Sequence, residues 1–192
     1  MASSFFSMIL RMKYIDRWGL MRNANKESLS EHTLDVAVIS HALAVIGKVR
    51  LHKEIEPERA ALLALYHDAS EIITGDMPTP VKYYDERITS AYKQVEAAAN
   101  RTLVSMLPED LKGEYIGFFE KQPNDDYLWK LVKAADKLSA LIKCIEEEKS
   151  GNTEFVRAKQ GIEESIRQME LPELAIFLEE FFEPFTKTLD EQ

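Results

Sequence analysis

Residues 66–71 read Tyr-His-Asp-Ala-Ser-Glu, a stretch that places an imidazole beside one carboxylate and just before another. It follows an apolar segment that opens at Pro57, a residue favoured in the first turn of a helix, so we expect a helix from Pro57 to Ile73. Residues four apart share a helix face, which would point His67 and Glu71 in one direction, with Asp68 about 100° away. An imidazole and a carboxylate side by side at one edge of a helix could together bind a divalent metal ion.

Two further stretches supply candidate ligands of the same chemical types. Ser-Glu-His at 30–32 lies in the first turn of a helix that a capping box opens at Ser28. Lys-Ala-Ala-Asp-Lys-Leu at 133–138 places an aspartate midway along another expected helix, beside its apolar stripe. Two imidazoles and two carboxylates on three converging helices would leave positions open for water and a substrate oxygen. The candidate metal ligands are therefore His32, His67, Asp68 and Asp136.

Each candidate ligand also has a simpler interpretation. Asp136 could pair at the surface with Lys133 or Lys137, and His67 could be a hydrogen-bonded core histidine. Asp68 could be a capping or paired carboxylate, and His32 could interact with the end of its helix. An aspartate has poor helix propensity, however, and burying its charge without a partner is costly, which a bound cation would resolve. Glu71 is not needed to complete the metal set, so it is available for acid–base chemistry.

Helical periodicity dominates the rest of the chain, and strand patterns are almost absent, so we expect an all-α protein. Gly75, Pro78 and Pro80 predict a loop at 75–80. No internal repeat or Gly/Ser linker divides the sequence, which favours a single domain over residues 1–192. Other helices are expected at 3–14, 28–47, 85–107, from 108 onward, at 126–149, and on both sides of 171–172.

Composition narrows the classes of partner. The chain has 192 residues and a formal net charge of −9, and no Lys/Arg cluster accompanies its aromatic residues, which argues against a nucleic acid polymer. A compact anionic substrate held by one or two local cations remains compatible with this charge. The single cysteine, Cys144, cannot form an internal disulfide, so we expect a cytoplasmic protein. We expect no membrane span, which would need about twenty apolar residues.

Further motifs extend the pattern beyond the candidate ligands. They are Arg17-Trp18, residues 20–23, 30–32, 66–83 and 143–147, and Gly151-Asn152. Together they resemble the bacterial 5′-deoxynucleotidases of the HD superfamily of metal-dependent phosphohydrolases. The resemblance extends over most of the chain and implies an HD-domain helical bundle with the metal site between converging helices. It also implies a homodimer and a divalent transition metal, with Co²⁺ preferred in vitro and Mn²⁺ or Cu²⁺ as alternatives.

The resemblance also implies roles for individual residues. His32, His67, Asp68 and Asp136 would bind the metal, and Glu71 would be the catalytic acid or base. Arg17 would act in catalysis by holding the phosphate, because a guanidinium offers a fixed fork to its oxygens. Trp18 would exclude a ribose 2′-hydroxyl, and Asp76 would accept from the sugar 3′-hydroxyl. The implied substrate contacts are Arg17, Trp18, His32, Asp68, Asp76, Met77, Pro78, Thr79 and Asp136.

Simpler interpretations of the substrate residues remain open. Trp18 could pack on the N-terminal helix, Arg17 could pair with a surface acid, and Asp76 could cap local amides. Gly19 departs from the proline that the resemblance leads us to expect after the Arg-Trp pair, which predicts a looser loop and weaker sugar discrimination.

The predicted activity is hydrolysis of deoxyribonucleoside 5′-monophosphates to deoxynucleosides and phosphate, with selectivity against ribonucleotides. A triphosphate tail would need more cations than Arg17, Arg22 and Lys82 supply near the motifs. Three alternatives stay open. They are another HD phosphohydrolase acting on cyclic nucleotides or alarmones, a metal-binding regulatory module without turnover, and an all-helical interaction protein.

Overall fold

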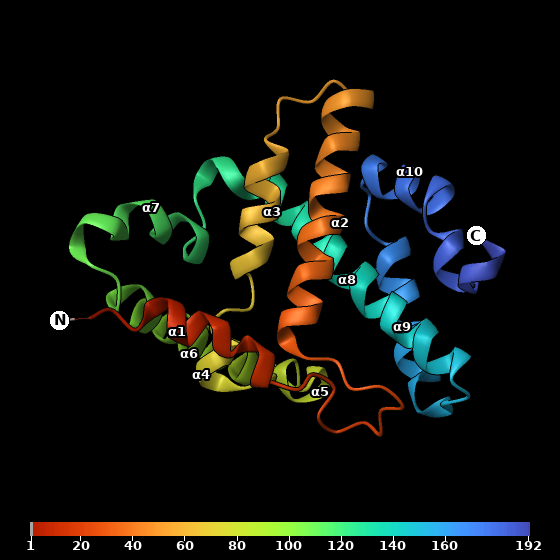
Figure 1. Cartoon of the computed structure of the whole chain (residues 1–192), viewed down its shortest axis with the longest axis horizontal. Helices are drawn as coiled ribbons and strands as arrows, with labels where there is room; N and C mark the ends of the chain where they lie inside the picture. Colours follow the sequence, from red (N-terminus) through yellow and green to blue (C-terminus); the bar gives the residue numbers. More distant parts are fainter. Residues whose placement is uncertain (1) are drawn as a thin grey trace.

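The computed structural model describes residues 2–192, and its regular elements are helices (Figure 1), which confirms the all-α prediction. Helices α2 (Leu29–Arg50) and α3 (Pro57–Tyr66) stand side by side, and α8 (Asp126–Lys149) packs against both. Extended pairing within residues 2–192 is limited to one isolated bridge, between Asp16 and Ser28. The three helices α2, α3 and α8 therefore form the frame on which the rest of the fold is arranged.

Helix α2 begins as its sequence predicts. Ser28 Oγ accepts from the Glu31 amide at 3.3 Å, and Glu31 Oε2 accepts from the Ser28 amide at 2.7 Å, which completes a capping box. The expectation that no segment resembles a membrane span needs correction, because α2 is long and apolar enough by length and composition alone. Its most apolar window is 56% buried inside the protein, however, as in the core helix of a globular fold.

The expected helix from Pro57 to Ile73 is wrong at its end, because α3 stops at Tyr66. The chain then tightens into turns, in which the amides of Ala69 and Glu71 donate to carbonyls three residues back, at 3.1 and 2.9 Å. Helix α4 (Glu71–Thr74) starts only after them. His67 and Glu71 therefore do not share a helix face, and each reaches the site from a different element.

The predicted loop at 75–80 is confirmed only in part. Gly75 adopts a left-handed φ of 73° and ends α4, as a glycine does most readily. Helix α5 (Thr79–Lys82) then begins inside the predicted loop, because Pro80 lies in its first turn, where a missing amide costs nothing. The irregular part of this segment is thus shorter than expected.

The remaining helices lie close to their predicted positions. Helix α1 (Phe5–Ile9) continues into a 3₁₀ turn (Leu10–Tyr14), in place of one regular helix. The others are α6 (Glu86–Ser105), α7 (Glu109–Phe119), α9 (Val156–Arg167) and α10 (Pro172–Glu180). Further 3₁₀ turns are Pro123–Asp125, Thr153–Phe155, Glu183–Thr186 and Leu189–Glu191.

Two apolar clusters hold these helices together. The first joins α2, α3, α8 and α10 around buried leucines such as Leu43, Leu63 and Leu138. It includes Phe177, the first residue of a C-terminal apolar run that consists of Phe177, Leu178, Phe181, Phe182 and Phe185, whereas Phe181 is 43% exposed. The run therefore begins in the hydrophobic core at Phe177 and reaches the surface at Phe181.

The second cluster joins α1, α6 and α7 around Phe5 and includes Ala69. Ala69 lies in the turn between α3 and α4, so this turn connects one cluster to the other. Burial of Ala69 in the second cluster explains why α3 cannot run on as a straight helix. His67 and Asp68 stand at that junction.

Candidate metal centre and substrate cavity

The structure brings the four predicted ligands together from three parts of the chain. His32 comes from the first turn of α2, His67 and Asp68 from the turn after α3, and Asp136 from the middle of α8. His32 Nε2 lies 3.2 Å from Asp136 Oδ1 and 3.7 Å from Asp68 Oδ2, and His67 Nε2 lies 3.0 Å from Asp68 Oδ2. One ligand atom from each of His32, His67 and Asp68 lies within 4.8 Å of the others.

Both imidazoles are oriented by their Nδ1 atoms. His67 Nδ1 lies 2.7 Å from the Ala64 carbonyl oxygen, and His32 Nδ1 lies 3.0 Å from Ser139 Oγ. A carbonyl only accepts, so His67 Nδ1 carries the proton there and Nε2 is the free lone pair of the neutral ring. Each Nε2 atom is buried and faces an aspartate oxygen, at 3.2 Å for His32 and 3.0 Å for His67, but neither makes a hydrogen bond. Such orphaned nitrogens are costly, and a divalent cation between them would satisfy both, so the residues fit a metal.

The charges of the centre also suit a cation. Burial raises the pKa of both aspartates, but their histidine neighbours outweigh it, and the pKa values of Asp68 and Asp136 lie below their usual range. Burial lowers the pKa of His67, while the Asp68 carboxylate raises it to about 9. Ligation requires the neutral imidazole, so metal affinity is expected to increase with pH.

Glu71 lies beside this centre and is 5% exposed. Burial, followed by the negative charges of Asp68 and Asp76, raises the pKa of Glu71 to about 9. Its Oε2 atom is buried without a hydrogen-bond partner. The raised pKa favours the protonated form of Glu71 at neutral pH, and its Oε2 atom is available to a hydrogen-bond partner.

Arg17 and Trp18 lie in the irregular segment before α2. Arg17 Nη1 donates to Glu27 Oε2 at 2.7 Å, so its ion pair is with a buried acid and not with a surface one. Trp18 packs against Phe155 with ring centres 5.2 Å apart, and its backbone amide donates to Asp76 Oδ2 at 3.0 Å. The interpretations of Trp18 as packing on the N-terminal helix, and of Asp76 as capping local amides, do not match these contacts.

A cavity of about 650 Å³ is lined by six of the nine predicted substrate contacts, whereas His32, Asp68 and Asp136 are not among its lining residues. Arg17 and Trp18 line one side and residues 76–79 another. Lys137, which follows Asp136 on α8, also lines it. Burial lowers the pKa of Arg17, but the nearby charges of Glu27, Asp136 and Asp68 raise it. Because Arg17 lines the cavity, the cavity lies beside the candidate ligands, and the individual roles stay predictions.

The sequence interpretation missed part of this lining. Helix α9 contributes Arg157, Ala158, Gly161, Ile162 and Ser165. These small, polar and charged residues form no motif, so only the packing of α9 on α8 places them here. Lys137 could have been found from its place beside Asp136.

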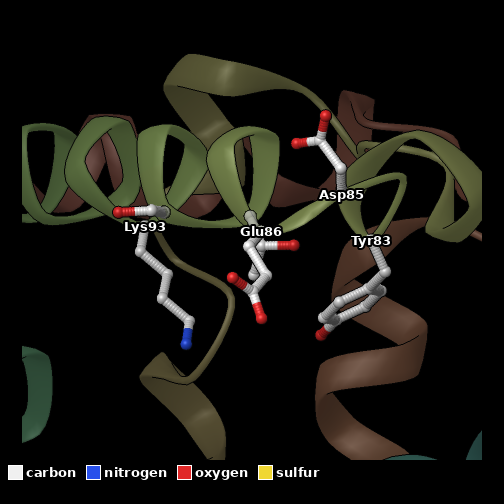
Figure 2. Close-up of a pocket in the computed structure, with 6 residues that line it drawn as sticks. Tyr83, Asp85, Glu86 and Lys93 are labelled. Atoms are coloured by element: carbon white, nitrogen blue, oxygen red, sulfur yellow. The ribbon is translucent and has the colours of Figure 1, made fainter.

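A second hollow of about 450 Å³ lies at the start of α6 (Figure 2). Glu86 and Lys93 extend from the same side of α6 toward the space beside Tyr83, while Asp85 points the other way. Lys93 is the one basic residue that lines this hollow, against two acids, so it does not suit a phosphate. Tyr83 lines both this hollow and the larger cavity.

Comparison with solved structures identifies the fold. An HD-domain phosphohydrolase from Listeria innocua superposes with a TM-score of 0.83 over 95% of this chain and 88% of its own, at 22% identity. An HD phosphohydrolase from cyanophage S-2L, DatZ, which is bound to dA and one catalytic Zn²⁺ ion, matches with a TM-score of 0.61 at 20% identity, over 92% of this chain and 95% of its own. The predicted HD-domain fold is confirmed.

Sequence comparison identifies the family. A 5′-deoxynucleotidase of Vibrio cholerae is 46% identical over 98% of this chain and 97% of its own length. A 5′-deoxynucleotidase of Erwinia tasmaniensis is 45% identical over 98% of this chain and 96% of its own. The family model described as 5′-deoxynucleotidase YfbR-like matches residues 4–185. This chain therefore belongs to the YfbR-like 5′-deoxynucleotidase family of HD-domain phosphohydrolases, and it is a phosphoric monoester hydrolase.

Proposed function

We propose that this chain hydrolyses deoxyribonucleoside 5′-monophosphates to deoxynucleosides and phosphate, and that it selects against ribonucleotides. The curated relatives named 5′-deoxynucleotidase support the activity. The observation that carries the proposal is the position of Arg17, which lines the cavity with Trp18 and residues 76–79 and lies near enough to Asp68 and Asp136 for their charges to act on it. A monophosphate there would place its phosphorus near the cluster and its sugar in the cavity.

His32, His67, Asp68 and Asp136 would hold a divalent cation, as their orphaned Nε2 atoms and ionised carboxylates support. A bound divalent metal supplies a water of lowered pKa and neutralises phosphate charge. We propose Co²⁺ as the preferred metal in vitro, with Mn²⁺ or Cu²⁺ as alternatives, on the basis of the family resemblance. The Zn²⁺ of the cyanophage protein supports a divalent metal in this fold.

Glu71 would manage the proton that the reaction requires. Its neutral carboxyl group can donate to the 5′ oxygen as that oxygen leaves the phosphorus, because burial favours the protonated form. Water replaces the 5′ oxygen on phosphorus, and the proton that this water loses returns Glu71 to its neutral form. The products are then an uncharged deoxynucleoside hydroxyl and inorganic phosphate.

Arg17 would bind the phosphate and Trp18 would bound the sugar. Arg17 Nε is buried without a partner, so an N–H donor remains available to a phosphate oxygen. Asp76 uses Oδ2 for the Trp18 amide, which leaves Oδ1 free to accept from a 3′-hydroxyl. A 2′-hydroxyl against the Trp18 ring would lose its hydrogen bonds to water, which favours deoxyribose. Met77, Pro78 and Thr79 complete the cavity on the Asp76 side.

We also propose a single-domain, cytoplasmic homodimer that needs neither a nucleic acid polymer nor a membrane. The dimer rests on the family resemblance. Leu34 and Val38 support it, because they lie one turn apart on α2 and are 59% and 61% exposed.

The test is phosphate release from paired ribo- and deoxyribonucleotides across a metal series. Protein stripped with a chelator and then loaded with Co²⁺ or Mn²⁺ should release orthophosphate from dAMP and much less from AMP. Pyrophosphate release from a triphosphate would contradict the proposal. A gain in thermal stability on metal addition without turnover would instead indicate a metal-binding module.

A further inference from the structure

Glu27 occupies a defined place in the segment that carries Arg17 and Trp18. The Asp16–Ser28 bridge closes this segment, and the Arg17 amide donates to the Glu27 carbonyl at 2.9 Å. Glu27 thus lies opposite Arg17, where the segment returns toward the start of α2. Its side chain is only 10% exposed. The backbone hydrogen bond holds Glu27 beside Arg17, although the two residues are ten positions apart in the sequence.

One oxygen of Glu27 serves both residues. Glu27 Oε2 accepts from Arg17 Nη1 at 2.7 Å and from the indole Nε1 of Trp18 at 3.0 Å. The Arg17 guanidinium carbon also lies 5.7 Å from the centre of the Trp18 ring. Because the acceptor atom is shared, the guanidinium and the indole cannot shift independently of each other.

We propose that Glu27 is a positioning residue that couples phosphate binding by Arg17 to sugar discrimination by Trp18. The inference rests on the proposed function and assigns a role to a residue that no sequence motif marks. Glu27 itself touches no substrate in this scheme. It acts through the two side chains that it holds.

The contact between Glu27 and Arg17 leaves another N–H group of the guanidinium without a hydrogen-bond partner. Glu27 engages Nη1 alone, while Nε is buried without a hydrogen-bond partner. An arginine bound on one side by a carboxylate loses little further side-chain entropy when an anion binds its other side. The negative charge of Glu27 also raises the pKa of Arg17, although burial alone would lower it.

The Trp18 contact fixes a residue whose backbone conformation is unusual. Trp18 has a φ of 60°, a region that bulky side chains seldom adopt, so surrounding contacts must hold it. Asp76 holds its amide, Phe155 packs on its ring, and Glu27 holds its indole nitrogen. Gly19 follows Trp18 at a position where the family resemblance implies proline, and a glycine restricts the backbone less than a proline does. The side-chain contacts of Trp18 therefore have to supply the restriction.

The experiment compares Glu27→Ala and Glu27→Gln with a matched control, Asp16→Ala. Asp16 belongs to the same segment and pairs with Lys26 at 2.7 Å, but its side chain is 54% exposed and far less enclosed than that of Glu27. Each variant is made in the wild-type chain and in a Trp129→Phe chain, in which Trp18 is the one remaining tryptophan. The readouts are kcat and KM for dAMP and AMP, inhibition by inorganic phosphate, and tryptophan emission without substrate.

In Glu27→Ala, the KM for dAMP and the inhibition constant for phosphate should both rise about tenfold, as expected for loss of one charge-assisted hydrogen bond. The dAMP/AMP preference should fall about fivefold or more, because a mobile indole tolerates the 2′-hydroxyl. Trp18 emission should shift to the red as the ring becomes hydrated. Glu27→Gln keeps an acceptor oxygen and should retain most of the emission and sugar preference, and Asp16→Ala should match the wild type in every readout.

Three results would overturn the coupling. The first is a folded Glu27→Ala protein with unchanged phosphate inhibition and sugar preference. The second is an equal loss of kcat for both sugars with KM unchanged. The third is Trp18 emission identical to that of the parent. The emission needs no substrate, so it tests the hold of Glu27 on Trp18 even if the parent releases no phosphate from dAMP, a result that would refute the proposed function instead.

Discussion

Lys143 and Glu147 form a buried ion pair one turn apart on α8, with Nζ and Oε1 separated by 2.5 Å. Glu147 also accepts from the backbone amides of Ala24 and Asn25, at 2.7 and 3.1 Å. These contacts fasten the loop that carries Arg17 and Trp18 to the helix that carries Asp136. The residues proposed to contact phosphate and sugar are thereby held at a fixed position relative to the candidate metal ligand Asp136.

Replacing Glu147 with Ala should therefore destabilise the protein strongly. The variant leaves the Lys143 ammonium buried without its partner and the loop amides without an acceptor, which should lower the free energy of unfolding by about 3 kcal/mol or more. Urea denaturation followed by circular dichroism measures this. The neighbouring Glu148→Ala is the control, because that side chain is 55% exposed and its loss should cost no more than about 1 kcal/mol. Equal effects of the two substitutions would contradict the structural role of Glu147.

The same carboxylate predicts a pH dependence of stability. Burial raises the pKa of Glu147, but hydrogen bonds from Lys143, Ala24 and Asn152 hold it at about 2, below its ordinary value of 4.5. A depressed folded-state pKa stabilises the protein above the unfolded-state value, and this stabilisation is lost as pH falls toward 2. The free energy of unfolding should therefore fall more between neutral pH and about pH 3 for the wild type than for Glu147→Gln, which cannot titrate there. Parallel curves would show that Glu147 does not contribute.

Glu71→Ala should abolish turnover and keep the metal. Glu71 is assigned proton transfer and not ligation, so we expect kcat to fall about a hundredfold or more. Metal content by elemental analysis should stay at the wild-type level. Glu86→Ala, which removes an exposed acid on α6, should leave kcat unchanged. Full activity in Glu71→Ala would refute its role.

Ser139→Ala should weaken metal binding through His32. Ser139 is 1% exposed, and its hydroxyl lies 3.0 Å from His32 Nδ1, so it orients the ring. Loss of such a partner usually costs about 10–100-fold in metal affinity, which competition with a chelator measures. Ser40→Ala on α2 is the control, since that hydroxyl is equally buried but has no partner. An unchanged Co²⁺ affinity in Ser139→Ala would contradict this orienting role.

Shrinking Trp18 to Ala should relax the preference for deoxyribose. The cavity would gain room and water beside the sugar 2′ position, so kcat/KM for AMP should rise relative to that for dAMP by about tenfold. Steady-state kinetics with both nucleotides measure the ratio. Trp129→Phe serves as the control because Trp129 does not line the cavity. A ratio equal to that of the wild type would count against Trp18 as the sugar wall.

Structural features that depend on residues close together in the sequence, or on recognisable motifs, could be predicted from the sequence. The capping box at Ser28 fixed the start of α2, and the types and spacing of His32, His67, Asp68 and Asp136 pointed to a common centre that the structure assembles. The end of α3 could not be predicted, because Ala69 is drawn into a cluster formed by distant helices. Glu27 belongs to no motif, and its importance follows only from the folding of its segment against Arg17 and Trp18.

The turn between α3 and α4 has a consequence for dividing the protein. Three of the candidate ligands precede Gly75, and Asp136 follows some sixty residues later on α8, which packs with α2 and α3 in the first apolar cluster. Any backbone cut between α5 and α8 would leave an incomplete donor set on each fragment. Reassembly of two such fragments would then be favoured by the ion itself, which would make this fold a natural starting point for a split reporter of divalent metals.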